Sequence, residues 1–326
     1  MSACKQAQPC EFFTMRTNMD SFETRWRKEK VVIVMGATGT GKSRLSIDLA
    51  TRFPAEIVNS DKMQVYKGID IVTNKVTEEE KCGVLHHLLG VVDPDAEFTA
   101  TDFRNLASLA VQSILGRGRV PIIVGGSNSY IQALVNDLEF MSKYECCFLW
   151  VDVALPVLHS FVSHRVDQMV ELGLVDEVRG IFDPEADYSR GIRRAIGVPE
   201  MKQYLLAEAS ADEETRARLL EAAISDIKVN TCQLACCQLE KIHRLRTLWN
   251  LHRLDATDAF LKRSGGEADK AWEKLVAGPS TMIMGQFLYE EDGEATISSP
   301  TATPVMTAVI IGTVMTAGPM TFFTSC

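Results

Sequence analysis

The sequence predicts an α/β protein with a doubly wound parallel sheet and a helical insertion lobe. Three observations carry this prediction: short apolar runs alternate with helical patterns, a glycine-rich segment follows the first apolar run, and a mostly helical stretch interrupts the alternation. Strands buried on both faces of a parallel sheet are continuously apolar, as these runs are. A chain of 326 residues suffices for one large α/β domain with an insertion, or for two domains.

The apolar run 31–35 is the first predicted strand, and the apolar spacing over 43–52 predicts a helix directly after it. The same two patterns recur along the first half of the chain. Further strands are predicted at 56–58, 86–92, 120–124 and 147–153, and further helices at 99–115 and 127–135. Thr99 or Thr101 is the expected cap of the helix that ends near Gly116.

From 156 to 249 the pattern becomes mostly helical, with helices predicted at 157–172, 198–206 and 213–248. The segment HRLDA at 252–256 is interpreted as a short strand that rejoins the sheet, so the helical part is an insertion or appended lobe and not an independent domain. We therefore expect a flexible N-terminus or transit segment at 1–29, a P-loop core at 30–155, a helical lobe at 156–250, a return strand and helix at 251–278, and a disordered, uncharged tail at 279–326.

Charge and composition exclude several classes of protein. The 34 basic and 43 acidic residues give a formal charge of −9, which argues against a protein that coats nucleic acid. No apolar stretch is long enough to cross a bilayer, and the N-terminus has no secretory signal, so we expect neither nucleic-acid nor membrane partners. The nine cysteines include two adjacent pairs, and their total is odd. This pattern does not fit a set of disulfides and predicts reduced thiols.

The glycine-rich segment lies between the first predicted strand and the first predicted helix. It fits G-x-x-x-x-G-K-[ST] at every position, so the predicted fold is a P-loop doubly wound sheet. In such a loop, backbone N–H groups surround an anion, the lysine contacts the outer phosphate and the last hydroxyl binds Mg²⁺. A nucleoside triphosphate and an allylic diphosphate fit equally well. The loop residues are Gly36, Ala37, Thr38, Gly39, Thr40, Gly41, Lys42 and Ser43, with Ser43 as the predicted metal ligand.

Asp61 closes the second predicted strand. Ligands of doubly wound sheets bind beyond the carboxyl ends of the strands, so Asp61 is expected to face the same crevice as the loop. From its position alone, Asp61 has three alternative roles: it binds Mg²⁺ through water, acts as a general base, or caps the following helix. Asp152, at the end of a later strand, is the rival metal ligand.

A set of motifs goes beyond a general nucleotide fold and resembles the plant adenylate isopentenyltransferases, the cytokinin-forming enzymes. These are related to the tRNA dimethylallyltransferases. The resemblance extends from Val31 to Trp272, and its specificity lies in the joint set. The motifs are the loop at 36–43, IVNSDKMQVY at 57–66, DIVTNK at 70–75, HHLLG at 86–90, FT at 98–99, PIIVGGSNSY at 121–130 and GIRRAIG at 191–197.

This resemblance implies that the loop holds the diphosphate of dimethylallyl diphosphate. The adenine N6 amine of ATP, ADP or AMP then attacks the allylic carbon. Asp61 matches the catalytic acid that orients the amine and accepts its proton, and Thr38 matches the threonine that contacts the diphosphate near the scissile bond. Lys42 and Ser43, with Mg²⁺, would stabilise the leaving charge.

Other residues take roles from the same resemblance. Arg165 matches an arginine that reaches the diphosphate, against the alternative of a surface helix arginine. Ser127 matches a substrate-contacting position and is also a helix N-cap candidate. Lys228, Arg193 and Arg194 are the candidates for the phosphates of the acceptor nucleotide.

One position departs from the family pattern. Family members usually carry arginine before the glutamine at 238, where this chain has Cys237. A thiol supplies neither a guanidinium charge nor a bidentate fork, so either Lys241 or Arg244 compensates or activity is reduced.

Four functions are therefore compared. The leading one is dimethylallyl transfer to ATP, ADP or AMP in cytokinin biosynthesis. The alternatives are a tRNA dimethylallyltransferase, a P-loop small-molecule kinase, and a weakened nucleotide-binding or regulatory homologue. The acidic charge favours a free nucleotide over tRNA, and the segments at 125–130 and 191–197 are not explained by a kinase. A plastid and a cytosolic location both remain open.

Overall fold

The computed structural model describes residues 28–262 and 265–289. Its centre is a six-stranded sheet in the order β3-β2-β4-β1-β5-β6, in which all neighbouring strands are parallel. This confirms the predicted fold class. The strands are β1 (Glu29–Met35), β2 (Ala55–Asn59), β3 (His86–His87), β4 (Val120–Val124), β5 (Tyr144–Asp152) and β6 (Leu251–Asp255).

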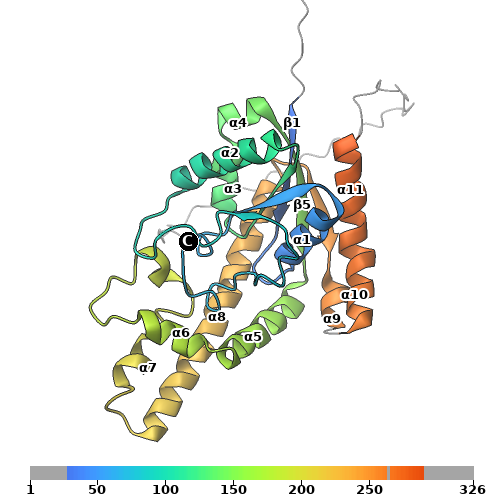
Figure 1. Ribbon diagram of the computed structural model, residues 1–326. Coiled ribbons are helices and arrows are strands. Elements are labelled where there is room, and N and C mark those ends of the chain that lie inside the picture. Colours follow the sequence, from blue (N-terminus) through green and yellow to red (C-terminus); the bar gives the residue numbers. More distant parts are fainter. Residues whose placement is uncertain (1–27, 263–264, 290–326) are drawn as a thin grey trace, which may run out of the picture.

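Helices connect the strands and cover both faces of the sheet (Figure 1). The helix α2 begins at the predicted cap, where Thr99 and Asp102 form a reciprocal capping box. The helical segments are α1 (Lys42–Arg52), α2 (Ala100–Gly116), α3 (Asn128–Val135), α4 (Leu138–Lys143), α5 (Leu155–Glu171), α6 (Leu174–Ile181), η1 (Gly191–Arg194), α7 (Lys202–Ala207), α8 (Glu213–Leu245), α9 (Thr257–Leu261), α10 (Gly266–Trp272), η2 (Glu273–Ala277) and α11 (Gly278–Tyr289).

The central strand β1 shows why its sequence is apolar throughout. Val31, Ile33 and Met35 belong to the core on one face of the sheet, together with residues of α2 and α3. Val32 and Val34 belong to the core on the other face, together with residues of α1 and α9–α11. Because successive side chains point to opposite faces, a strand covered on both sides has no position left for a polar residue.

The strand order decides which loops meet. The strands β2, β4 and β1 are neighbours, and Asn59 and Val34 both pair with Val124 at the carboxyl ends of their strands. Three segments therefore leave the same edge of the sheet side by side: the glycine-rich loop after β1, Asp61 after β2, and Ser127 after β4. The sheet thus brings the predicted site residues together at one edge.

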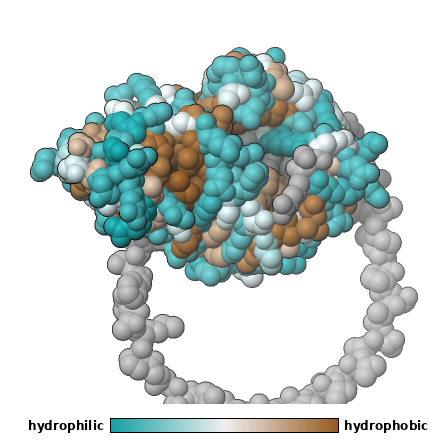
Figure 2. Space-filling model, turned by 90° about the horizontal axis from the view of Figure 1, so that it is seen from below, coloured by the Kyte–Doolittle hydropathy of each residue, from teal (hydrophilic) through white to brown (hydrophobic). Residues whose placement is uncertain are grey.

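The helical lobe projects from this edge. In Figure 1, α6, α7 and one end of the long helix α8 extend away from the sheet, with α5 between them and the C-terminal helices. Figure 2 views this end of the molecule and shows hydrophobic surface in strips between hydrophilic ridges. No helix in residues 28–262 or 265–289 is long and apolar enough to cross a membrane.

Two details differ from the sequence-based expectations. The third strand is only His86–His87, because Leu88 and Gly90 adopt positive φ values of 58° and 64° that turn the chain. The expectation of a disordered tail from 279 is wrong for 279–289, which form α11 and place Met284 in the core. The rest of that predicted tail, 290–326, and nearly all of the predicted flexible segment 1–29 lie outside the described residues.

Candidate active site

A cavity of about 820 Å³ lies beyond the carboxyl ends of β1, β2 and β4. The loop residues Thr38, Gly39, Gly41, Lys42 and Ser43 line it, whereas Gly36, Ala37 and Thr40 do not. Asp61 and Ser127 line it from the neighbouring strands. Side chains of α5, α8 and the C-terminal helices complete the walls. A cavity of this size is in the range of small-molecule sites.

The loop is closed by its own side chains. The Thr40 hydroxyl donates to the Ala37 carbonyl at 3.0 Å, and Lys42 Nζ donates to the same carbonyl at 2.7 Å. The helix α1 begins at Lys42, so its N-terminal N–H groups and the positive end of its dipole point toward the cavity. These are the features of an anion-binding loop.

Two cations stand at the loop. Arg165 on α5 donates from Nη2 to the Thr38 hydroxyl at 3.1 Å, and its buried Nε has no hydrogen-bond partner in the described part of the chain. Burial lowers the pKa of Lys42 to about 8, an effect that nearby Asp61 opposes and nearby Arg165 reinforces. Burial also lowers the pKa of Arg165, again opposed by Asp61. Two partly desolvated cations facing one carboxylate favour an anionic ligand.

Asp61 is half-buried and held by the backbone. Its N–H donates to Asn59 Oδ1 at 3.1 Å, while its own Oδ1 accepts from the N–H groups of Met63 and Gln64 at 2.9 and 3.4 Å. The turn therefore orients the carboxylate toward the cavity that it lines. Because Oδ1 makes the local bonds, Oδ2 is the oxygen at which a ligand proton can be taken up.

Gln238 is a site residue that the sequence interpretation missed. It is buried on α8, its Oε1 accepts from the Thr38 N–H at 2.7 Å, and its Nε2 donates to the Gly126 carbonyl at 3.0 Å. One side chain thus connects the loop after β1 with the loop after β4. The only sequence signal was its place beside Cys237, because the loop it contacts lies 200 residues away.

Three cations line another part of the cavity wall. These are Lys62, Arg194 and Lys241, and the pKa of Lys62 is lowered by burial and by the other two charges. Ser127 lies close to them, because its hydroxyl accepts from the Lys62 N–H at 2.9 Å. Ser127 precedes α3 but its side chain does not cap that helix. These three cations form a second anion-binding subsite, which lies on the Asp61 side of the loop.

The structure corrects three expectations for charged residues. Lys228 pairs with Asp167 at 2.5 Å and lines a separate shallow groove, so it is removed from the main cavity. Arg193 pairs with Asp95, which turns it away from the cavity that Arg194 lines. Asp152, the rival metal ligand, accepts from Arg253 Nε at 2.7 Å and does not line the cavity.

Cys237 lines the main cavity and also the groove that contains Lys228. Of the two residues expected to compensate for the missing arginine, Lys241 lines the cavity, whereas Arg244 is exposed and does not. The six cysteines in the described residues are free thiols, as expected.

The donors at the loop suit a magnesium ion that is shared with a ligand. Ser43 lines the cavity at the start of α1, and no group of three or more His, Cys, Asp or Glu side chains in residues 28–262 and 265–289 is arranged so that it could hold a metal ion. Mg²⁺ commonly takes one or two protein ligands and completes its shell with phosphate oxygens and water. The residues present fit such an ion only together with a phosphorylated ligand.

The loop, the parallel sheet and the paired cations define a P-loop protein that binds a phosphorylated ligand. The profile of the IPP transferase family matches residues 64–145 and 139–244. The chain belongs to this family, and its relatives include the adenylate isopentenyltransferases.

Two of these relatives are from Arabidopsis thaliana. Adenylate isopentenyltransferase 5, chloroplastic, is 62% identical over 90% of this chain and 90% of its own length. Adenylate isopentenyltransferase 7, mitochondrial, is 55% identical over 88% of this chain and 89% of its own length. A solved structure of a eukaryotic dimethylallyltransferase acting on tRNA matches with a TM-score of 0.68 and 25% identity, over 80% of each chain.

Proposed function

We propose that this chain transfers the dimethylallyl group of dimethylallyl diphosphate to N6 of the adenine of ATP, ADP or AMP. The observation that carries the proposal is the shared cavity, in which Asp61 lies across from an anion-binding loop with the cations Lys42 and Arg165. The high identity to adenylate isopentenyltransferases supports a free nucleotide as acceptor rather than tRNA, since the tRNA-acting structure is much less similar.

In the proposed reaction, the N6 amine attacks the allylic carbon, the carbon–oxygen bond to diphosphate breaks, and N6 loses a proton. Asp61 orients the amine and accepts this proton at Oδ2, because backbone bonds to Oδ1 hold its carboxylate in the cavity. A fixed carboxylate and a fixed loop place the two reacting atoms in line, which lowers the entropic part of the barrier.

The loop stabilises the leaving diphosphate. Lys42 and Arg165 supply full charges, and Thr38, whose hydroxyl already contacts Arg165, lies where it can donate to the oxygen near the scissile bond. The buried Nε of Arg165 gains a partner when the anion binds. Ser43 would hold Mg²⁺, which supplies further charge neutralisation to the diphosphate when bound.

The second group of cations binds the phosphates of the acceptor. Lys62, Arg194 and Lys241 line the cavity on the Asp61 side, where a nucleotide whose adenine meets Asp61 extends its phosphates. Arg194 keeps the role expected from its motif, whereas Lys228 and Arg193 are not part of this proposal. Three cations suit a polyphosphate, so ATP and ADP are the proposed acceptors over AMP.

The test is product analysis by mass after incubation of the full chain with dimethylallyl diphosphate and each of ATP, ADP and AMP, with and without Mg²⁺. We expect an adduct of the nucleotide with the five-carbon group. An adduct only with tRNA would assign the chain to the tRNA enzymes. Phosphate transfer without prenyl transfer would assign it to the kinases, and no turnover would assign it to the weakened homologues.

The charge of Lys42 predicts a pH dependence. Below a pH of about 8 the free enzyme carries a protonated Lys42 that attracts the donor, and above it this charge is lost because the pKa is lowered. The donor itself keeps a constant charge there, since phosphate groups complete their ionisation near about pH 6. We expect kcat/KM for dimethylallyl diphosphate to fall above pH 8 in steady-state assays. Lys42→Arg is the control, and an equal fall in this variant would contradict the assignment.

Cys237 offers a gain-of-function prediction. An arginine at this position adds a cation to the cavity wall. We therefore expect Cys237→Arg to raise kcat/KM for prenyl transfer by about two- to tenfold. Cys236→Arg is the matched control, because Cys236 contacts His159 and lines only the shallow groove. An unchanged or lower rate in Cys237→Arg would show that Lys241 already supplies the charge.

We propose a plastid location. The N-terminal segment has a single acidic residue, Glu11, before Asp20, and a low content of acidic residues is a feature of transit peptides. A relative with 62% identity is named as chloroplastic. A fluorescent protein fused after residues 1–29 tests this in plant cells. Fluorescence in plastids is expected, and fluorescence in mitochondria or cytosol would overturn the proposal.

A further inference from the structure

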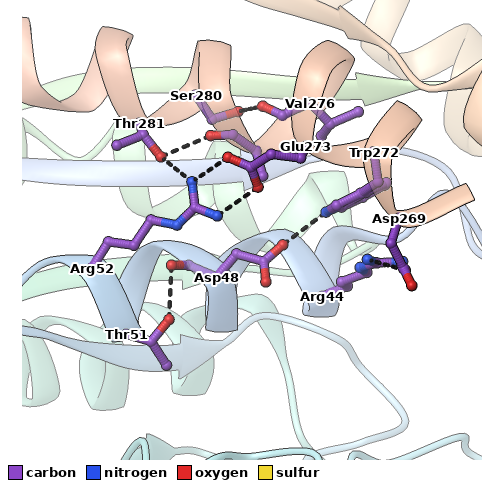
Figure 3. A network of polar contacts seen from close by, with 11 residues as sticks. Arg44, Asp48, Thr51, Arg52, Asp269, Trp272, Glu273, Val276, Ser280 and Thr281 are labelled. Carbon is purple, nitrogen blue, oxygen red and sulfur yellow. Dashed lines mark hydrogen bonds and ion pairs between the residues drawn. The ribbon is translucent and has the colours of Figure 1, made fainter. Parts of the chain in front are cut away.

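The C-terminal segments α10, η2 and α11 lie along α1, the helix that begins in the glycine-rich loop (Figure 3). They lie beyond residue 244, where the match to the family profile ends. Their residues form part of the hydrophobic core on the α1 face of the sheet, so this segment is an integral part of the fold. Its contacts with α1 fall into two groups.

The first group is far from the loop. Arg52, at the end of α1, donates to both carboxylate oxygens of Glu273 at 3.1 and 2.7 Å and to the Thr281 hydroxyl at 2.9 Å. In addition, Lys30 of β1 contacts the Phe287 carbonyl of α11, and its Nζ lies 5.3 Å from the centre of the Phe287 ring. These contacts dock the C-terminal helices but touch no residue that lines the phosphate end of the cavity.

The second group lies at the start of α1. The Trp272 Nε1–H donates to Asp48 Oδ2 at 2.7 Å, one turn beyond Arg44. The Arg44 guanidinium lies 4.8 Å from the centre of the Trp272 ring and pairs with Asp269 at 2.8 Å. Trp272 is only 3% exposed and still lines the main cavity. The indole is therefore fixed on both its edge and its face.

This indole lies directly against the loop. A Cβ added to Gly41, whose φ is +88°, would stand 2.7 Å from the Trp272 ring. On the other side, a Cβ added to Gly39 would stand 2.5 Å from Val162 of α5. The loop is thus held between α5 and Trp272, and Phe161 of α5 also contacts Phe260 of α9, with the ring centres 4.7 Å apart.

We infer that Trp272 is a positioning residue for the diphosphate donor: held by Asp48, it keeps Gly41 and the first N–H groups of α1 in the anion-binding arrangement. Misplacement of a reacting group by about 1 Å can lower the reaction rate about 100-fold. If the loop is held on only one side, we therefore expect both the affinity for the donor and the rate of transfer to fall. The inference rests on the proposed function in one respect, namely that the loop binds diphosphate.

The test measures the binding of inorganic diphosphate with Mg²⁺ to the full chain by calorimetry. Trp272→Phe keeps a ring against Gly41 and removes the N–H, and Asp48→Ala removes its acceptor. We expect each to weaken diphosphate binding by about tenfold, the effect of one hydrogen bond to a charged group. Asp48→Asn keeps an acceptor oxygen for the indole, and we expect it to bind like the natural protein.

The matched control is Arg52→Gln, which breaks the distant contacts of α1 with Glu273 and Thr281. We expect it to lower the melting temperature and leave diphosphate binding unchanged. In turnover assays, Trp272→Phe should raise the KM for dimethylallyl diphosphate by about tenfold, following the loss in binding, and leave the KM for the nucleotide unchanged.

Each remaining result has a defined meaning. Equal diphosphate binding by the natural protein, Trp272→Phe and Asp48→Ala would overturn the positioning role and leave the proposed function standing. The same loss in Arg52→Gln as in Trp272→Phe would reduce Trp272 to general stabilisation. Failure of the natural protein to bind diphosphate would overturn the proposed function as well.

Discussion

Replacement of Asp61 by asparagine is expected to lower kcat for prenyl transfer by about 10²- to 10⁴-fold, the range for loss of a positioned general base. Asparagine retains an oxygen that accepts from the Met63 and Gln64 N–H groups, so the turn is preserved and only the proton acceptor is lost. Asp61→Ala removes both functions and is less informative. The measurement is the rate of a single turnover with saturating donor and acceptor.

Two further measurements complete this test. Diphosphate affinity should not fall in Asp61→Asn when it is measured well below pH 8, where Lys42 stays protonated without the nearby Asp61 charge and the loop stays in place. Asp93→Asn is a control, since Asp93 is an exposed carboxylate that pairs with Lys67 on the surface. A normal turnover rate in Asp61→Asn would remove Asp61 from proton transfer and leave it as the acceptor of the local turn.

Replacement of Lys42 by alanine should lower kcat/KM for dimethylallyl diphosphate by about 10²- to 10³-fold, which is typical for removal of one preorganised group that stabilises transition-state charge. Lys42 is near enough to Arg165 and Asp61 for both of these charges to influence its pKa. Its loss leaves Arg165 as the other cation at the loop, so residual activity is expected. Steady-state kinetics with varied donor measure the effect.

The matched control for Lys42→Ala is Arg194→Met. Both residues are cations that line the same cavity, but Arg194 belongs to the group with Lys62 on the acceptor side. We expect Arg194→Met to raise the KM for the nucleotide and leave the KM for the donor unchanged. An increase of the nucleotide KM in Lys42→Ala, with normal donor kinetics, would show that the loop binds the acceptor instead.

The local patterns were sufficient for the elements around the site. The strand at 31–35, the loop at 36–43 and the helix after it were predicted within a residue or two, because each depends on neighbours in the chain. The cap at Thr99 was found for the same reason. The patterns failed to predict the end of a strand where the chain turns over a few residues. After His87, two residues with positive φ end the strand.

Contacts between distant segments were not predictable in this way. Gln238 contacts Thr38 across 200 residues, and the C-terminal helix α11 gave no strong periodic signal. Lys228 and Arg193 carried the right charge at plausible positions, but Asp167 and Asp95 lie close enough to pair with them. The charge of a side chain follows from its residue type alone. Its ion-pair partner depends on how the helices pack.

The amino-acid sequence determined the class of sheet, the anion-binding loop, the acid after the second strand and the family, since these depend on short segments and their neighbours. Only the tertiary structure decided that β4 lies between β2 and β1, which brings Asp61, Ser127 and the loop to one cavity. It also decided which cations face that cavity and that Trp272 supports Gly41. The physical reason is that burial and side-chain pairing are properties of the packed chain, in which residues hundreds of positions apart compete for the same space and the same charges.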